Sequence, residues 1–179
     1  MSGLRDQEQV RQLARRVGAK PREARILSAI ALCESPASVD GVPHADFNAV
    51  GDEHLANEVY GYSYGAWQIR SLRAHKGTGK YRDEERLLEP RFNAESALKV
   101  AREEGWERWT TYANGQYRAY LPDLFPPAPG THVVVYGDTL SGIAAQHGGF
   151  TWERLAEVNN LSSPYRLYIG QVLDLPAGS

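Results

Sequence analysis

The stretch Ile26 to Pro36, "ILSAIALCESP", is an apolar run that ends in an acid, a serine and a proline. In a helix, Ile26, Ile30 and Glu34 are four residues apart and share one face. We expect that face to be buried, which raises the pKa of a carboxyl group, and the negative end of the helix dipole acts in the same direction. Such a carboxyl group can act as a general acid. From this spacing alone, an ordinary exposed glutamate at a frayed helix end is the simpler interpretation.

Helices are expected on both sides of this stretch. Apolar periodicity predicts an amphipathic helix over residues 5–17 and a helix over residues 21–34, which Pro36 ends. The clearest helix covers residues 89–105, with Gly105 as its C-cap. The expected core residues of this part of the chain are Ile26, Ile30, Leu98 and either Trp106 or Trp109.

The segment between these helices has little apolar periodicity. Residues 35–63 are rich in Gly, Asp, Asn and His, which predicts irregular structure. Residues 65–75 are expected to form a short helix that carries Trp67, Ile69 and Leu72.

Charge and composition exclude some functional classes. The chain has 179 residues, is 42% hydrophobic and has a formal net charge of -2, which argues against generic nucleic-acid binding. Residues 1–25 are basic, with seven Lys or Arg against three acids. The basic helix over residues 5–17 fits either an anionic partner or a solvated helix face, and we favour the solvated face.

Cysteine and histidine usage predicts no metal site and no cofactor. Cys33 is the one cysteine, so an intrachain disulfide is excluded, and the five histidines lack the spacing of zinc ligands. The chain opens without an apolar signal core, and no run is long enough to span a bilayer. We therefore expect synthesis in the cytoplasm without a signal peptide, no stable membrane insertion and a monomer.

A proline-rich segment predicts a division into two domains. The sequence "LPDLFPPAPG", residues 121–130, has four prolines in ten residues and favours a semi-rigid spacer. We expect a domain over residues 1–121, a linker over 122–130 and a module over 131–179. Within that module, the sequence pattern predicts a strand over residues 131–136, a helix capped by Thr139, a second helix over 151–159 and a closing strand.

The C-terminal module resembles a LysM domain. The motifs "YGDTLSGIA", "LAEVNNL" and "YIGQVLDLP" follow one another at the family's spacing. The resemblance implies a small α+β (βααβ) fold and binding of glycans that contain N-acetylglucosamine, chiefly peptidoglycan or chitin. For Leu140 and Ile169, a purely structural role in the core is an open alternative. The implied glycan-binding residues are Gly137, Asp138, Thr139, Leu140, Tyr165, Leu167, Tyr168 and Ile169.

Residues 26–121 resemble the mainly α, lysozyme-like fold of soluble lytic transglycosylases and goose-type lysozymes. The motifs that carry this resemblance are Glu34-Ser35, "SYGAWQI" (63–69), "RFNAESAL" (91–98) and "TTYANG" (110–115). It implies that Glu34 is the catalytic acid/base and that Ser35 and Tyr112 position it. The implied sugar-binding residues are Tyr62, Tyr64, Trp67, Gln68 and Asn93. Two departures are Ala66, in place of the usual Leu or Ile, and the order Y-A-N-G, in place of Y-N-A-G.

The resemblance implies cleavage of the β-1,4 bond between N-acetylmuramic acid and N-acetylglucosamine, by one of two routes. A hydrolase of the inverting type needs a second carboxylate, whereas a lytic transglycosylase needs only Glu34. The candidates for a second carboxylate lie in the irregular segment, and for each of them a turn or capping role is also open. They are Asp40, Asp46, Asp52 and Glu53.

Two other functions fit parts of the pattern. A peptidoglycan peptidase that uses Cys33 is disfavoured, because that thiol would lie at the C-terminal end of a helix, where the dipole opposes a thiolate. A non-catalytic wall-binding or virion protein would keep the glycan-binding module and lose activity. The combination of modules without a signal peptide predicts a bacteriophage endolysin released by a holin, or a lysin carried by the virion.

Overall fold

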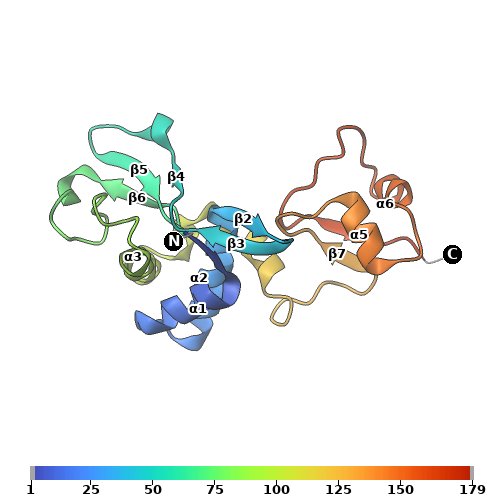
Figure 1. The fold of residues 1–179 in the computed structure, drawn as a ribbon, viewed down its shortest axis with the longest axis horizontal. Coiled ribbons are helices and arrows are strands. Elements are labelled where there is room, and N and C mark those ends of the chain that lie inside the picture. Colours follow the sequence, from blue (N-terminus) through green and yellow to red (C-terminus); the bar gives the residue numbers. More distant parts are fainter. Residues whose placement is uncertain (1–2, 178–179) are drawn as a thin grey trace.

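The computed structural model describes residues 3–177, which form two modules with separate hydrophobic cores (Figure 1). The first module is mainly α, and the second has the βααβ order that the sequence predicts. The elements of the first module are, in chain order, β1 (Leu4–Asp6), α1 (Gln7–Arg16), α2 (Pro21–Glu34), β2 (Pro36–Val39), β3 (Val42–Asp46), β4 (Val50–Gly51), η1 (Glu53–Leu55), β5 (Tyr60–Tyr64), β6 (Ile69–Leu72), η2 (Arg73–His75), α3 (Pro90–Glu103), η3 (Trp106–Arg108), α4 (Thr110–Ala113) and η4 (Gln116–Tyr120).

Helix α2 is the central element of the first module and has the predicted bounds. Pro21 occupies its first turn, where no backbone donor is needed, and the carboxylate of Glu23 accepts a hydrogen bond from the backbone N–H of Lys20 at 2.6 Å. Every residue from Ile26 to Leu32 is buried. Glu34 is the last helical residue, so the buried stripe delivers its carboxyl group to the end of the core.

The segment between α2 and α3 is more regular than the sequence predicts. Instead of an irregular stretch and a helix over residues 65–75, it forms the strands β2 to β6, which make antiparallel sheets with the orders β1-β3-β2, where β1 joins from the N-terminal side of α1, and β4-β5-β6. The strands are two to five residues long, too short for a visible apolar alternation. The expected helix is broken because Gly65 and Gln68 have φ values of 72° and 45°, which place a turn before β6.

The first core packs around two tryptophans. Trp67 is fully buried, meets Phe47 edge to face at 5.6 Å between ring centroids, and donates its indole N–H to the carbonyl of Leu27 at 2.8 Å. The indole N–H of Trp109 donates to the carbonyl of Trp67 at 2.8 Å. The predicted core residues Ile26, Ile30, Leu98 and Trp109 are buried, and Trp106 packs against the cluster from outside.

The second module consists of β7 (Thr131–Val133), α5 (Leu140–His147), α6 (Trp152–Val158) and β8 (Val172–Asp174), with β7 and β8 antiparallel. Thr139 caps α5 as predicted, since its hydroxyl accepts the N–H of Gly142 at 3.0 Å. The core is small and includes Val134, Leu140, Ile143, Leu155 and Leu173. The strand predicted from residue 131 ends at Val133, three residues early.

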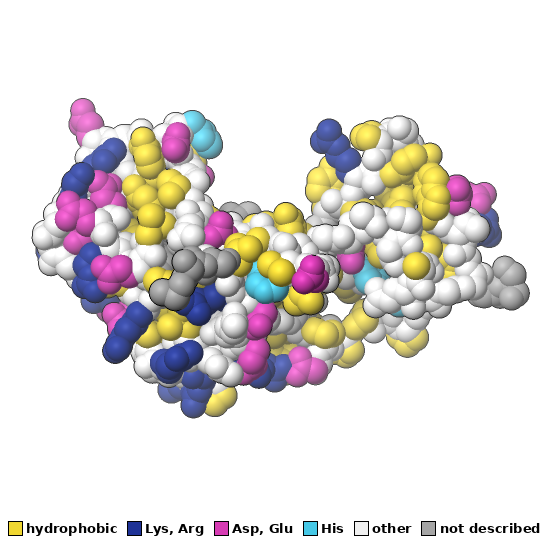
Figure 2. All heavy atoms as spheres, in the orientation of Figure 1, with side chains coloured by type: hydrophobic (Ala, Val, Ile, Leu, Met, Phe, Trp, Pro, Cys, Tyr) yellow, Lys and Arg dark blue, Asp and Glu magenta, His cyan; other side chains and the backbone are white. Residues whose placement is uncertain are grey.

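The two modules touch each other beside the proline-rich segment. The backbone N–H of Tyr136 donates to the hydroxyl of Tyr120 at 3.0 Å, and the side-chain amide of Gln116 donates to the carbonyl of Ile169 at 3.1 Å. A hollow separates the two lobes along the upper edge of the space-filling view (Figure 2). Within residues 3–177, no helix is long and apolar enough to cross a membrane. The predicted limits of the domains stay a prediction.

Candidate functional site

Glu34 opens into a pocket of about 450 Å³ in the first module. Four parts of the chain build its walls: the C-terminal end of α2, the segment from Asp52 to β6, the loop before α3 that carries Arg82, and the stretch from α3 to the start of α4. The pocket therefore lies where the main helix meets the β4-β5-β6 sheet. Its lining residues are Glu34, Asp52, Leu55, Ser63, Gln68, Ile69, Arg70, Arg82, Val100, Arg108, Trp109 and Thr110.

The environment of Glu34 raises the pKa of its carboxyl group. Burial is the main cause, and the negative charge of Asp52 acts in the same direction. Hydrogen bonds from Thr111 oppose the shift, because its hydroxyl donates to Glu34 Oε1 at 2.5 Å. Burial thus makes the carboxyl group of Glu34 easier to protonate than an exposed glutamate, and one donor holds its orientation, as suits a general acid.

Thr111, the neighbour of the predicted positioning residue Tyr112, is the residue whose side chain is hydrogen-bonded to Glu34. The ring of Tyr112 stacks on Tyr117 at 4.7 Å between centroids and lies against Trp106 at 5.7 Å. Successive residues of the one-turn helix α4 point in different directions, so only one of the pair can face the carboxyl group. The motif located the right turn of the chain, but nothing in the sequence indicated which hydroxyl faces Glu34.

Ser35 fixes the end of α2 without contacting the carboxyl group of Glu34. Its buried hydroxyl lies 3.0 Å from the carbonyl of Ala66 and accepts the backbone N–H of Asp46 at 3.1 Å. These contacts tie the end of the helix to both sheets. The predicted positioning role therefore acts through the backbone that carries Glu34.

Of the three predicted sugar-binding residues Trp67, Gln68 and Asn93, only Gln68 lines the pocket. Trp67 and Asn93 are fully buried. The side-chain amide of Asn93 donates to the carbonyl of Tyr64 at 3.0 Å, and a Cβ at Gly65 would lie within 2.5 Å of Asn93. Trp67 and Asn93 instead support the tight turn that presents Gln68, and their predicted contact with sugar stays a prediction.

The tyrosines Tyr62 and Tyr64 flank the pocket residue Ser63 on β5 but do not line the pocket themselves. Ser63 and its partner across the sheet, Arg70, both line it. Because side chains alternate along a strand, Tyr62 and Tyr64 project from the face opposite Ser63. Their rings lie 6.3 Å apart on that face.

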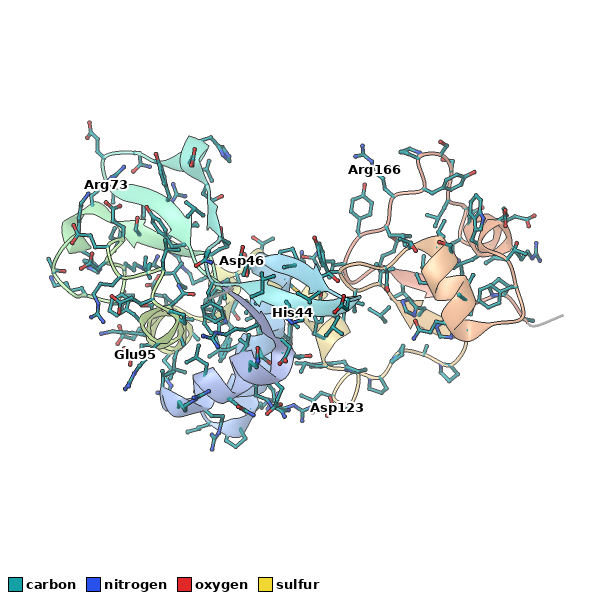
Figure 3. The ribbon with its side chains drawn as sticks, in the orientation of Figure 1. His44, Asp46, Arg73, Glu95, Asp123 and Arg166 are labelled. Carbon is teal, nitrogen blue, oxygen red and sulfur yellow. The ribbon has the colours of Figure 1, made fainter. Side chains whose placement is uncertain are left out.

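Asp52 is the candidate second carboxylate that the structure brings to the pocket. It accepts a hydrogen bond from the hydroxyl of Ser63 at 2.5 Å, and its charge acts on Glu34. Asp46 lies at the end of β3, near the middle of the molecule, and accepts the N–H of Asn48 at 2.8 Å, as a turn residue does (Figure 3). Asp40 and Glu53 do not line the pocket either.

A second pocket, of about 380 Å³, lies on the LysM module. It joins the turn before α5 to the loop that leads to β8, so the predicted residues Asp138, Thr139, Leu140, Tyr165 and Leu167 come together. Sequence reasoning missed Trp152, the first residue of α6, whose ring meets Tyr165 edge to face at 5.4 Å. The available signal was a tryptophan at the start of the helix that the sequence predicts over residues 151–159.

The other predicted glycan-binding residues lie outside this pocket. Tyr168 is 63% exposed and does not line it, and Gly137 supplies the turn with a φ of 90°. Ile169 packs against the core of the first module. The structural alternative is thus the one observed for Ile169, while Leu140 both packs in the LysM core and lines the pocket. In residues 3–177, no three His, Cys, Asp or Glu side chains gather as a metal site.

Comparisons with known proteins agree with this architecture. A family model described as a lysozyme like domain matches residues 11–111, and the LysM domain model matches residues 132–176. The chain is 35% identical over 111 residues to the N-acetylmuramoyl-L-alanine amidase XlyB of Bacillus subtilis (strain 168), a match that covers 62% of this chain and 31% of that protein. No solved structure matches. The chain belongs to the lysozyme-like domain family and carries a LysM domain at its C-terminal end.

Proposed function

We propose that the protein is a peptidoglycan-degrading muramidase that cleaves the β-1,4 bond between N-acetylmuramic acid and N-acetylglucosamine. The observation that carries the proposal is the partly buried carboxyl group of Glu34, which lines the pocket. Its pKa is raised by burial, and Thr111 orients it inside the pocket of a lysozyme-like module. Cleavage of a glycosidic bond needs such a proton donor for the leaving oxygen.

Glu34 performs the first step by giving its proton to the glycosidic oxygen. The bond between C1 of the muramic acid and that oxygen breaks, the leaving sugar departs as an alcohol, and Glu34 becomes a carboxylate. Nearby carboxylates stabilise the positive charge that develops on the sugar ring, and Glu34 and Asp52 supply them.

The second step has two outcomes with different proton acceptors. In a transglycosylase, ionised Glu34 takes the proton of the 6-hydroxyl group of the same sugar. The oxygen of that hydroxyl group then bonds to C1 and closes a 1,6-anhydro ring. In an inverting hydrolase, a second carboxylate removes a proton from water, which attacks C1. Asp52 is the residue positioned for that role, because it shares the pocket with Glu34.

The LysM module supplies an anchor on the same polymer. Its pocket combines two aromatic rings with the N-terminal end of α5, a mixture that suits the apolar faces and polar groups of amino sugars. Binding through LysM raises the local concentration of glycan at the Glu34 pocket, so that each site needs only modest affinity.

The biological setting that we propose is a bacteriophage lysin, either an endolysin that acts after holin release or a component of the virion. The amidase XlyB is named for a different bond, and this chain spans less than a third of its length.

A cysteine-dependent mechanism at Cys33 is disfavoured by the electrostatics of the structure. Burial and the neighbouring Glu34 raise the pKa of its thiol to about 12.

Replacing Glu34 by Gln tests the proposal. An amide has nearly the same shape but cannot protonate the leaving oxygen, so cleavage of purified peptidoglycan should fall by about 10²–10⁴-fold with the thermal stability retained. Glu107→Gln, at an exposed acid outside the pocket, is the matched control. Undiminished lysis by folded Glu34→Gln protein would refute the assignment.

A further inference from the structure

Three arginines line one side of the Glu34 pocket, and the function proposed above does not use them. They come from different elements: Arg70 from β6, Arg82 from the loop before α3, and Arg108 from the end of η3. Their convergence places a concentration of positive charge beside the carboxyl group that acts on the sugar.

Arg82 is a structural member of this set. Its guanidinium group is almost fully buried, contacts both carboxylate oxygens of Glu104, at 2.8 and 2.7 Å, and donates to the carbonyl of Arg70 at 2.6 Å. These contacts use its donors on both sides. Arg82 therefore holds the backbone of β6 and leaves little capacity for a ligand.

Arg70 and Arg108 are less completely neutralised. Arg108 is about half exposed, and its Nε lies 3.2 Å from a carboxylate oxygen of Glu104, which it shares with Arg82. Arg70 lies 5.0 Å from the ring centroid of Tyr60 and donates to the carbonyl of Leu55. Among the described residues, no carboxylate lies within ion-pair distance of Arg70, and Arg82 and Arg108 share the carboxylate of Glu104.

Peptidoglycan offers a matching charge at a defined place. Its sugar backbone is uncharged, and its carboxylates are on the peptide stems, which hang from the lactyl group of each muramic acid. A guanidinium group binds a carboxylate through parallel hydrogen bonds, which fixes both position and orientation. Chitin has no such group.

We propose that Arg70 and Arg108 form a subsite for a carboxylate of the peptide stem on the muramic acid in the Glu34 pocket. The inference rests on the proposed muramidase function and narrows its substrate to glycan that carries ionised stems. Holding the stem would align the muramic acid that bears it, so that the bond from C1 of that sugar is the one presented to Glu34.

The test compares purified peptidoglycan with the same material after carbodiimide coupling to ammonia, which converts the stem carboxylates to uncharged amides. The sugar chains and the lactyl amide linkages are unchanged. The protein variants are Arg108→Gln and Arg70→Gln, and Arg91→Gln is the control, because Arg91 is 79% exposed on α3 and outside the pocket. Melting temperatures identify any variant that fails to fold, and Arg108, at the surface, keeps the test valid if Arg70→Gln does not fold.

The wild-type protein should cut the amidated material with a kcat/KM about tenfold lower than the untreated material. A factor of this size is typical for the loss of one charge-assisted hydrogen bond. Arg108→Gln should lose a similar factor on untreated peptidoglycan and little on the amidated form, whereas Arg91→Gln should match the wild type on both. Equal wild-type rates on the two substrates, or equal losses for Arg108→Gln on both, would overturn the subsite and leave the muramidase proposal standing. Failure of the wild type to release sugar fragments from untreated material would overturn the muramidase proposal itself.

Discussion

The two pockets of this protein differ in what they do to the groups that line them. The Glu34 pocket holds titratable side chains from four parts of the chain, and burial raises the pKa of Glu34 among them. The LysM pocket presents exposed aromatic rings and a helix start, and Asp138 is its one acidic lining residue. The first arrangement favours proton transfer and the second favours adhesion, so a change of the same residue type should have different consequences in the two modules.

The tryptophans Trp67 and Trp152 give the sharpest form of this comparison. Trp67 is fully buried and connects α2 to the turn before β6, whereas Trp152 is 36% exposed at the LysM pocket. Trp67→Ala should lower the free energy of unfolding by about 3–5 kcal/mol, as measured by denaturant unfolding, because it leaves a large cavity. A loss of sugar binding without a loss of stability would instead indicate that Trp67 contacts the substrate.

Trp152→Ala should produce the opposite pattern. The ring supplies apolar surface to the LysM pocket, so its removal should weaken binding to peptidoglycan or to N-acetylglucosamine oligomers by roughly tenfold, with little change in the unfolding of the first module. Sedimentation with insoluble peptidoglycan measures the effect. Tyr168→Ala is the control, because Tyr168 is more exposed but lies outside the pocket. Equal losses for both variants would show that the pocket is not the binding surface.

Thr111 provides a smaller and more specific test of the Glu34 pocket. Its hydrogen bonds favour the ionised form of Glu34 and therefore lower a pKa that burial raises. Thr111→Val removes the side-chain donor, so the pKa of Glu34 should rise further. Because the acid acts in its protonated form, the decline of kcat/KM on the alkaline side should move to higher pH. Thr111→Ser, which keeps the hydroxyl group, should restore the original profile, and an unmoved profile in Thr111→Val would contradict the contact.

Cys33 should be the least sensitive position tested. Its thiol has a pKa raised to about 12, is partly buried beside Glu34 and does not line the pocket. Cys33→Ser should therefore retain peptidoglycan cleavage, and iodoacetamide should modify the native protein slowly. Complete loss of activity in a folded Cys33→Ser variant would revive a cysteine-dependent mechanism.

The sequence predicted the longer helices well and the sheets of the first module poorly. The predicted bounds of α1, α2, α3 and α6 agree with the structure to within about two residues, and α5 begins after its predicted cap, Thr139, whereas the helix expected over residues 65–75 did not form. The first-module strands are too short for a pattern, and β1 pairs with β3 across about 40 residues of chain. Long-range pairing of this kind leaves no local trace in a sequence.

The same distinction applies to the pocket. Motifs located the turns that surround Glu34, but they did not tell which side chain of each turn faces it. Thr111 replaced Tyr112, Ser63 replaced its neighbouring tyrosines, and Trp67 and Asn93 proved to be supports of the turn that carries Gln68. A one-residue difference in a strand or a helical turn reverses the direction of a side chain, and only the three-dimensional register determines it.

Mass spectrometry of the fragments released from purified peptidoglycan is the most direct test of the central claim, that Glu34 cuts the glycan. The wild type should release disaccharide units that still carry their peptide stems, and Glu34→Gln should release none. Ends with a 1,6-anhydro ring would indicate a transglycosylase, and reducing ends would indicate a hydrolase and direct the next substitution to Asp52. Release of free peptides from uncut glycan strands, as by an amidase, would contradict the account.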